Sequence, residues 1–166
     1  MIKLIGVKSG DNESIALLES LSHTIWNEHY PDIISQEQID YMLNKYHSFE
    51  SFSRQIDVGY RYLLVQFEND TIGYCCYKLE DDETIFLNKL YIKKSEQRKG
   101  IGNSILNTML DEIKNYKYIR LQVNRKNTKA INFYLKNGFE IEKIQDFDIG
   151  GGFVMEDYVM IKKINV

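Results

Sequence analysis

The sequence predicts one mixed α/β (α+β) domain, in which helices flank a central, mostly antiparallel sheet that contains one parallel β-α-β crossover. Three observations support this fold class. A chain of 166 residues with 43% hydrophobic residues has the size and composition of a single domain with its own core. Helix-like and strand-like patterns alternate along it, with three successive strands in the middle. No repeat, linker or low-complexity segment divides it, so we expect one domain over residues 1–166.

The first third of the chain is expected to be mainly helical. Residues 1–7 alternate weakly between apolar and polar, as a strand does. Asp11 or Asn12 can cap a helix whose apolar residues recur at helical spacing until Pro31 ends it. The expected elements are a strand at 1–7, a helix from about 13 to 30, a helix at 36–46 and a short polar helix or loop at 48–57.

The middle of the chain changes to a strand pattern. A stretch rich in β-branched and aromatic residues stops at the turn pair Asn69-Asp70, and an acidic turn at 80–83 follows the next strand. The predicted strands lie at 60–67, 71–79 and 84–93. Short turns join them, so they are expected to be antiparallel neighbours.

The last third alternates helices and strands and ends in a hairpin. Gly138 is a suitable left-handed cap for the second of these helices. The predicted elements are a helix at 101–115, a strand at 118–123, a helix at 127–137 and strands at 139–147 and 153–164. The strands on either side of the first helix form a β-α-β unit, so they should run parallel.

Charge and composition argue against some classes of function. A net charge of −3 argues against general nucleic-acid binding, which needs a basic surface, and is compatible with a cationic small-molecule substrate. No apolar run approaches the ~18 residues that cross a bilayer, and the N-terminus lacks a signal-peptide core, so we expect no membrane partner and a cytoplasmic location. His23, His29 and His47 have no metal-ligand spacing with Cys or acidic residues, so we expect no metal.

A glycine-containing loop lies between the strand that ends near 93 and the following helix. It reads Gln97-Arg98-Lys99-Gly100-Ile101-Gly102. Free N–H groups and the helix dipole at the start of a helix attract anions, glycines allow close approach, and two cationic side chains add charge. The loop therefore predicts a phosphate site, but a charged surface turn fits it equally well. It matches neither a dinucleotide-binding Gly-x-Gly-x-x-Gly nor a Walker A loop.

The helix at 127–137 carries a second pattern. Asn127, Ala130 and Tyr134 are spaced i, i+3 and i+7, so they share one face of the helix. The first is polar and can bond a ligand amide, the second leaves room, and the third ends in a hydroxyl that can donate a proton. An aromatic core residue is the alternative interpretation of Tyr134.

Together these two motifs resemble the Gcn5-related N-acetyltransferase (GNAT) superfamily. Its acetyl-CoA motif, Gln/Arg-x-x-Gly-x-Gly/Ala, is matched by Gln97, Gly100 and Gly102, and its Asn-x-x-Ala-x-x-x-Tyr helix by 127–139, which ends in Gly-Phe. The resemblance covers nearly the whole chain and implies the GNAT (acyl-CoA N-acyltransferase) fold. It also implies an acetyl-CoA-dependent N-acetyltransferase with no metal and, at the level of the family, a homodimer.

The resemblance implies a role for each matched residue. Backbone groups of 97–103 would hold the CoA pyrophosphate, the strand at 90–92 would pair with the pantetheine arm, and Asn127 would touch that arm from the other side. Tyr134 would protonate the departing thiolate as general acid. The expected cofactor residues are Leu90, Tyr91, Ile92, Gln97, Arg98, Lys99, Gly100, Ile101, Gly102, Asn103, Asn127 and Lys136.

One position departs from the family pattern. Many members carry a glutamate general base two residues before the position of Leu90, and this chain has Asn88 there. An amide cannot take a proton at neutral pH, so deprotonation of the amine must use water, another carboxylate or solution. Asn88 is expected to share one strand face with Leu90 and Ile92, from which it can position a water.

The acceptor side resembles the polyamine N-acetyltransferase branch, in the segments 26–35 and 148–158. The residues expected to contact a cationic amine are Trp26, Glu28, Tyr30, Asn88 and Asp157, through aromatic faces and carboxylates. In the plainer interpretation the acids are solvated and the aromatics belong to the core. A protein or peptide amino-group acetyltransferase and a non-catalytic CoA-binding regulatory module remain alternatives.

Overall fold

The computed structural model describes residues 1–97 and 100–165, so Arg98 and Lys99 lie outside the described residues. Seven strands form one sheet in the order β1-β2-β3-β4-β5-β7-β6, and every neighbouring pair is antiparallel except β4 and β5. The fold class predicted from the sequence is confirmed. The elements are β1 (Ile2–Gly6), α1 (Asn12–His29), α2 (Gln36–Tyr46), α3 (Phe49–Asp57), β2 (Arg61–Phe67), β3 (Asp70–Leu79), β4 (Thr84–Ile92), a 3-10 helix (Lys94–Glu96), α4 (Ile101–Glu112), β5 (Tyr118–Asn124), α5 (Thr128–Lys136), β6 (Glu140–Gly150) and β7 (Phe153–Lys163).

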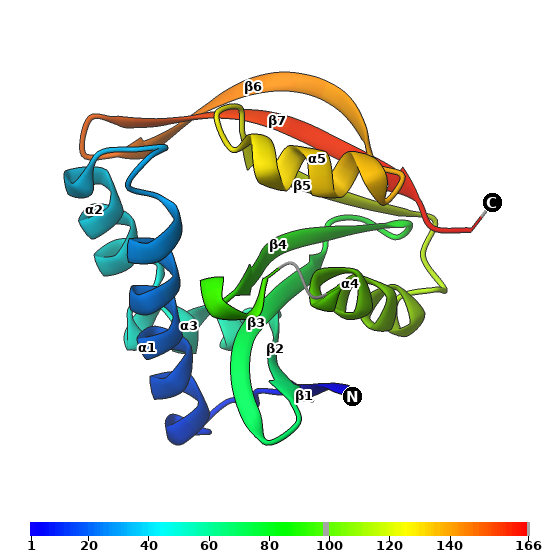
Figure 1. Ribbon diagram of the computed structural model, residues 1–166, viewed down its shortest axis with the longest axis horizontal. Coiled ribbons are helices and arrows are strands. Elements are labelled where there is room, and N and C mark those ends of the chain that lie inside the picture. The colour runs from blue at the N-terminus through cyan, green and yellow to red at the C-terminus, as the bar shows by residue number, and fades with distance from the viewer. Residues whose placement is uncertain (98–99, 166) are drawn as a thin grey trace.

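Helices cover both faces of the sheet (Figure 1). Helices α4 and α5 pack on one face and α1 and α3 on the other, and each face has its own buried cluster. The adjacent residues Cys75 and Cys76 show the alternation, since the first is buried with α4 and α5 and the second with α1 and α3. The sheet therefore lies between two helical layers. The ends of these layers come together where β4 and β5 diverge.

The parallel pair β4–β5 is short. Its register runs only from Thr84 opposite Tyr118 to Leu87 opposite Leu121. Beyond this point β5 pairs with β7 as far as Asn124, and β4 keeps only its partner β3. Figure 1 shows the two strands diverging toward the N-terminal helices. The backbone edge of β4 beyond Leu87 is therefore left without a strand partner on that side, as an incoming extended ligand requires.

A β-bulge in β4 corrects one expectation. Cys76 is opposite Lys89 and Tyr77 is opposite Leu87, so Asn88 is the extra residue of the bulge. Leu87 and Leu90 consequently pack into the same core layer although they are three residues apart. Asn88 therefore does not share a face with Leu90 and Ile92 as a regular strand would place it.

The tip of the β6–β7 hairpin is tied to α2. The Ile149 carbonyl accepts hydrogen bonds from the hydroxyls of Tyr41 at 2.7 Å and Tyr46 at 3.1 Å, and from the Lys45 ammonium at 3.1 Å. Gly150 next to it has φ +85°, and a Cβ added there would lie 2.6 Å from the Tyr41 hydroxyl oxygen. This position therefore requires glycine, both for its backbone angle and for the close contact.

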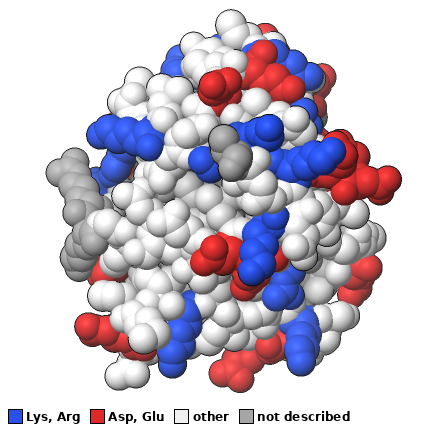
Figure 2. Space-filling view, turned by 90° about the vertical axis from the view of Figure 1, so that its right-hand side faces the viewer, with Lys and Arg blue, Asp and Glu red and all other residues white. Residues whose placement is uncertain are grey.

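The surface mixes charges of both signs. On the face shown in Figure 2, acidic and basic side chains of the described residues alternate rather than gather by sign. Within residues 1–97 and 100–165, no helix combines the length and the apolar character needed to cross a membrane.

Candidate active site

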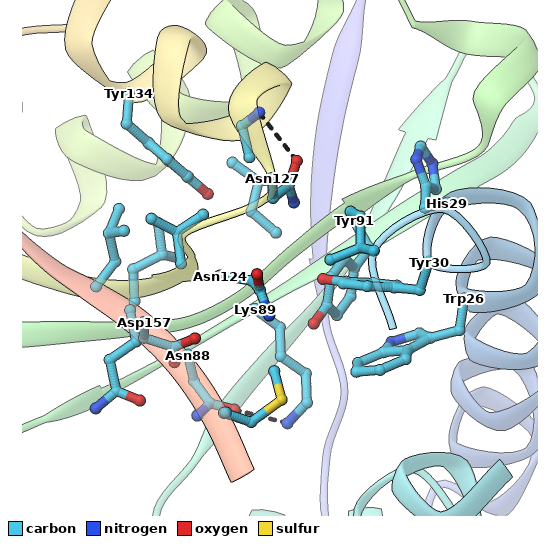
Figure 3. A pocket seen from close by; sticks show the side chains of 18 of the residues that line it. Trp26, His29, Tyr30, Asn88, Lys89, Tyr91, Asn124, Asn127, Tyr134 and Asp157 are labelled. Carbon is cyan, nitrogen blue, oxygen red and sulfur yellow. Dashed lines mark hydrogen bonds between the residues drawn. The ribbon is translucent and has the colours of Figure 1, made fainter. Parts of the chain in front are cut away.

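A cavity of about 1500 Å³ occupies the gap between β4 and β5. Its walls come from the end of α1, from β4, from the start of α4, from the end of β5, from α5 and from the β6–β7 hairpin. Figure 3 shows side chains from these distant segments pointing into one space. The cavity therefore gathers most of the residues that the sequence singled out.

One end of the cavity has the features of an anion site. Gly100 is the N-cap of α4 with φ +72°, and it lines the cavity together with Gly102 and Asn103. A Cβ at Gly102 would lie 3.1 Å from the Phe133 ring, so this glycine lets α4 and α5 approach closely. Ile101 is buried in the core, so only its backbone can serve a ligand there. Among the described residues, Lys129, which donates to Gln97, and Lys136, which is next to Asn137 and so near Asn103, are cationic residues near this end.

Gln97 is held by its neighbours rather than left free. Its amide nitrogen lies 2.8 Å from His29 Nε2 and 3.2 Å from the Ile92 carbonyl, and Lys129 donates to its amide oxygen. His29 also lies 3.1 Å from the Ile92 carbonyl, and burial lowers its pKa, which favours the neutral ring. The sequence did not single out His29 as a site residue, because only the fold brings the end of α1 to the end of β4.

The α5 helix presents two of the predicted residues. Asn127 is its N-cap, and the Asn127 Oδ1 accepts a hydrogen bond from the Ala130 N–H at 3.2 Å (Figure 3). This bond fixes the start of the helix, so the side chain has a structural role as well as a place on the cavity wall. Ala130 also lines the cavity.

Tyr134 directs its hydroxyl into the cavity (Figure 3). The residue is 9% exposed, and its ring packs against Phe133 and Phe139 with centroids 5.2 and 5.3 Å away. Burial raises the pKa of this hydroxyl above its ordinary value, so it stays protonated at neutral pH. The cavity therefore contains a fixed donor that is a weak acid by itself.

The acceptor-side aromatics form a stacked wall. Trp26 and Tyr30 stack with ring centroids 4.1 Å apart, and Tyr91 lies edge-on to Trp26 at 6.0 Å. All three line the cavity, although Trp26 is only 2% exposed and belongs largely to the core. Burial raises the pKa of Tyr30 to about 12.

Glu28 does not join this wall. It is exposed, and its Oε2 accepts a hydrogen bond from the Lys94 N–H at 3.1 Å. The carboxylate faces the start of the 3-10 helix, because its position on α1 differs from that of Trp26 by half a helical turn. Glu28 lies outside the cavity lining, so the structure does not bring it together with the other predicted substrate residues, and its contact with a substrate stays a prediction.

A buried lysine lies next to Asn88. Lys89 is 8% exposed, and its ammonium donates to the Tyr62 hydroxyl at 2.6 Å, to Asn88 Oδ1 at 2.6 Å and to Gln55 Oε1 at 3.2 Å. It also lies 5.2 Å from the centre of the Tyr62 ring. Desolvation lowers the pKa of Lys89 to about 8. Sequence reasoning missed this residue, although a lysine inside an apolar strand was a visible signal.

Asp157 is the buried carboxylate of the cavity. It is 5% exposed, lies on β7 opposite Asn124, and its Oδ1 has no hydrogen-bond partner among the described residues. Desolvation raises its pKa to about 6. The described residues contain no cluster of three or more His, Cys, Asp or Glu side chains arranged to hold a metal. The site thus offers an anion-binding end, a hydroxyl donor and an unpaired carboxylate.

Comparisons with known proteins agree with this geometry. The family model described as "Acetyltransferase (GNAT) family" matches residues 18–139. The structure of PaiA N-acetyltransferase from Thermoplasma acidophilum in complex with coenzyme A is similar, with a TM-score of 0.80 and 25% identity over 98% of this chain and 99% of that chain.

Two curated relatives are also similar. One is an uncharacterized N-acetyltransferase from Mycobacterium tuberculosis, 29% identical over 104 residues, which cover 61% of this chain and 66% of the relative. The other is a probable spermine N(1)-acetyltransferase from Bacillus subtilis subsp. natto, 28% identical over 99 residues, which cover 54% of this chain and 65% of the relative. The chain spans just under two thirds of the length of these relatives. The family match over residues 18–139, on a fold of this topology, shows that the chain belongs to the acetyltransferase (GNAT) family.

Proposed function

We propose that the protein transfers the acetyl group of acetyl-CoA to a primary amine of a small cationic substrate, with polyamines as the substrate class. The observation that carries the proposal is the shared cavity. It joins the N-terminus of α4, the unpaired edge of β4 and the Tyr134 hydroxyl, in the order that an extended thioester ligand would meet them. The similar PaiA enzyme was crystallised with coenzyme A, which supports the same ligand here.

The donor would be held mainly by backbone. The first N–H groups of α4 have no partner within the helix, so they can bind phosphate oxygens beside Gly100 and Gly102. Lys129 and Lys136 lie near this end and add charge. The free edge of β4 beyond Leu87 would pair with the amides of the pantetheine arm as an added strand.

Tyr134 would act on the leaving sulfur. A thiol has a pKa near 8.5, and burial raises the pKa of this tyrosine above its ordinary value, so full proton transfer from tyrosine to thiolate is uphill. The hydroxyl can still donate a hydrogen bond that stabilises charge on sulfur as it develops. The hydroxyl proton then moves to sulfur as the amine nitrogen gives its own proton to Tyr134.

The acceptor end supports a cationic amine. The Asp157 carboxylate is buried and its Oδ1 is unpaired, so a protonated amine would give it an ionic and hydrogen-bonding partner. The stacked pair Trp26–Tyr30 lines the same cavity from the end of α1, across the open space from Asp157 (Figure 3), and offers an aromatic face. The similar spermine N(1)-acetyltransferase and PaiA protein favour polyamines among small amines.

The hairpin tip weighs against a protein substrate. Residues of α2 and of β6 both line the acceptor end, and the hydrogen bonds of Tyr41, Lys45 and Tyr46 to the Ile149 carbonyl bridge these two walls. A peptide laid across the site would need an open groove where this bridge lies. A free small amine does not.

The test is an acetyl-CoA consumption assay with spermidine, spermine, an aminoglycoside, free amino acids and an N-terminal peptide, with products identified by mass spectrometry. We expect a polyamine to be acetylated. Tyr134→Phe should lower kcat by about a hundredfold with acetyl-CoA affinity unchanged, and Tyr116→Phe, outside the cavity, should leave both unchanged. Tight CoA binding without turnover of any amine would instead identify a non-catalytic CoA-binding module.

A further inference from the structure

The proposed reaction needs a group that removes a proton from the acceptor ammonium, and the family position for it holds Asn88. Among the described residues that line the cavity, only a few side chains can accept a proton near neutral pH. Lys89 is one, because burial lowers its pKa to about 8, but its nitrogen is already bonded to Tyr62, Asn88 and Gln55. The carboxylates are Asp32, Asp148 and Asp157, and the imidazoles are His29 and His47. The structure distinguishes sharply between them.

Asn88 cannot act as the base itself. Its Oδ1 accepts a hydrogen bond from the Lys89 ammonium, which can only donate, so the amide is oriented with its oxygen toward that lysine. The remaining face of the amide is its NH₂ group, another donor. The amide itself takes no proton at neutral pH, although its NH₂ group or its second oxygen lone pair can hold a water. Asn88 therefore cannot be the base itself, and its positioning of a water stays a prediction.

The imidazoles are occupied elsewhere. His47 is 2% exposed and packs between Trp26 and Phe52, with Nδ1 3.4 Å from the Tyr74 hydroxyl. His29 lies at the donor end, where Gln97 and the Ile92 carbonyl surround its Nε2. Among the described residues, no carboxylate is hydrogen-bonded to either ring to stabilise the protonated form.

Two of the three carboxylates are at the rim. Asp32 and Asp148 are exposed, and Asp148 Oδ1 already accepts a hydrogen bond from the Gly150 N–H at 2.9 Å. Asp157 differs from both, because it is only 5% exposed and its Oδ1 has no hydrogen-bond partner among the described residues. Its strand neighbour Asn124 is the last residue of β5, at the point where the chain leads into α5 and Tyr134.

We propose that Asp157, on β7, is the catalytic general base of this acetyltransferase, taking a proton from the ammonium group of the acceptor. Figure 3 shows Asp157, Asn88 and Tyr134 bordering one space, into which the tyrosine hydroxyl points. The base thus comes from the strand on the far side of the β4–β5 gap, whereas the family pattern places it on β4. This assignment rests on the proposed function.

The proton balance closes with groups already in the cavity. The carboxylate of Asp157 takes one proton from R–NH₃⁺, and the freed nitrogen lone pair forms a bond to the acetyl carbonyl carbon. The carbon–sulfur bond breaks, sulfur keeps the electron pair, and it receives the hydroxyl proton of Tyr134. The second nitrogen proton returns to Tyr134, and Asp157 releases its proton to solvent. The products are the acetamide, the CoA thiol and one proton.

The electrostatic surroundings suit this role. Desolvation raises the pKa of Asp157 to about 6, the charge of Asp146 on β6 also raises it, and the guanidinium of Arg125 lowers it. Arg125 spends its own hydrogen bonds on Asp146 Oδ1 at 2.8 Å and on the Asp157 backbone carbonyl at 3.2 Å, so the Asp157 side chain stays unpaired. Tyr30 is the titratable group facing it from the segment after α1. A base with a pKa about one unit below neutral is ionised at pH 7 and still basic enough to work.

The test is the pH dependence of kcat/KM, measured with spermidine or with whichever amine of the panel above is turned over. The wild type should lose activity below an apparent pKa of about 6. Asp157→Asn should lower kcat/KM at pH 7 by about a hundredfold or more and remove this acid limb of the pH profile. The rate of the variant should instead rise tenfold per pH unit, as the amine deprotonates in solution. Asp157→Glu should restore part of the limb.

Two controls make the result decisive. Glu156→Gln changes the exposed neighbouring acid on the other face of β7, and it should keep the wild-type profile. Acetyl-CoA binding, followed by thermal melting, should be unchanged in all three variants. Should Asp157→Asn retain the acid limb, the assignment of Asp157 would be overturned while the proposed function stands. A wild type that acetylates no amine would overturn the proposed function itself.

Discussion

The unpaired carboxylate of Asp157 should cost the protein stability in a way that depends on pH. Its pKa is raised from 3.8 to about 6 by burial, so the folded state binds this proton more tightly than the unfolded state. A raised carboxyl pKa stabilises the fold at acid pH, and this contribution is lost as the pH rises through about 6. A shift of roughly two units corresponds to about 3 kcal/mol in full, of which about 2 kcal/mol falls between pH 4.5 and pH 8.

The measurement is urea unfolding of the wild type and Asp157→Asn at pH 4.5 and at pH 8. The substitution has its own cost, but that cost cancels when the difference between the two proteins is compared at the two pH values. We expect the variant to gain about 2 kcal/mol relative to the wild type on going to pH 8. If the two proteins instead lose or gain stability in parallel, Asp157 is not an unpaired buried acid, and the argument for its role as base loses its foundation.

Two further substitutions test the cavity wall. Burial lowers the pKa of Lys89 to about 8, so its charge destabilises the fold below pH 8. In urea unfolding, the free energy of unfolding of the wild type should therefore rise by about 2.5 kcal/mol relative to that of Lys89→Met between pH 7 and pH 10. The same pH dependence of stability in both proteins would contradict this. Gly150→Ala places a Cβ 2.6 Å from the Tyr41 hydroxyl at φ +85°, so it should raise KM for the amine severalfold and lower stability by about 1–3 kcal/mol. Gly152→Ala has φ +80° and no atom within 4 Å, so it is the control for backbone strain alone, and an equal effect on KM in both variants would remove the role of the hairpin tip.

Local signals predicted most of the fold. The helix at 36–46 matches α2 residue for residue. The segment 48–57, expected as a short polar helix or a loop, is the helix α3 from Phe49, capped by Ser48. Gly138 has the left-handed φ of +84° expected of a helix cap. The parallel pair β4–β5 also follows from the order of elements. These features depend on short stretches of sequence, in which capping residues and periodicity act directly on the backbone.

What the sequence could not predict depends on contacts between distant segments. The bulge at Asn88 is a mismatch between β4 and β3, so neither strand shows it alone. Glu28 lies away from the cavity because the 3-10 helix packs beside α1, and that short helix was not predicted. Arg98 and Lys99 lie outside the described residues, so their expected phosphate contacts stay predictions, as does the homodimer. The sequence predicts Asp157 as a substrate contact, and only its burial and its missing partner in the structure point to the role of base.

The central claim is that acetyl-CoA binds in the gap between β4 and β5 with its phosphates at the start of α4, and thermal melting with added acetyl-CoA tests it most directly. At a ligand concentration near 100 times Kd, the wild type should melt roughly 5–10 °C higher than without ligand. Gly102→Glu adds bulk 3.1 Å from the Phe133 ring and a negative charge beside the phosphates, and it should abolish the shift. Asn107→Glu adds the same charge at an exposed position of α4 and should keep the full shift. An undiminished shift in Gly102→Glu, or none in the wild type, would contradict the account.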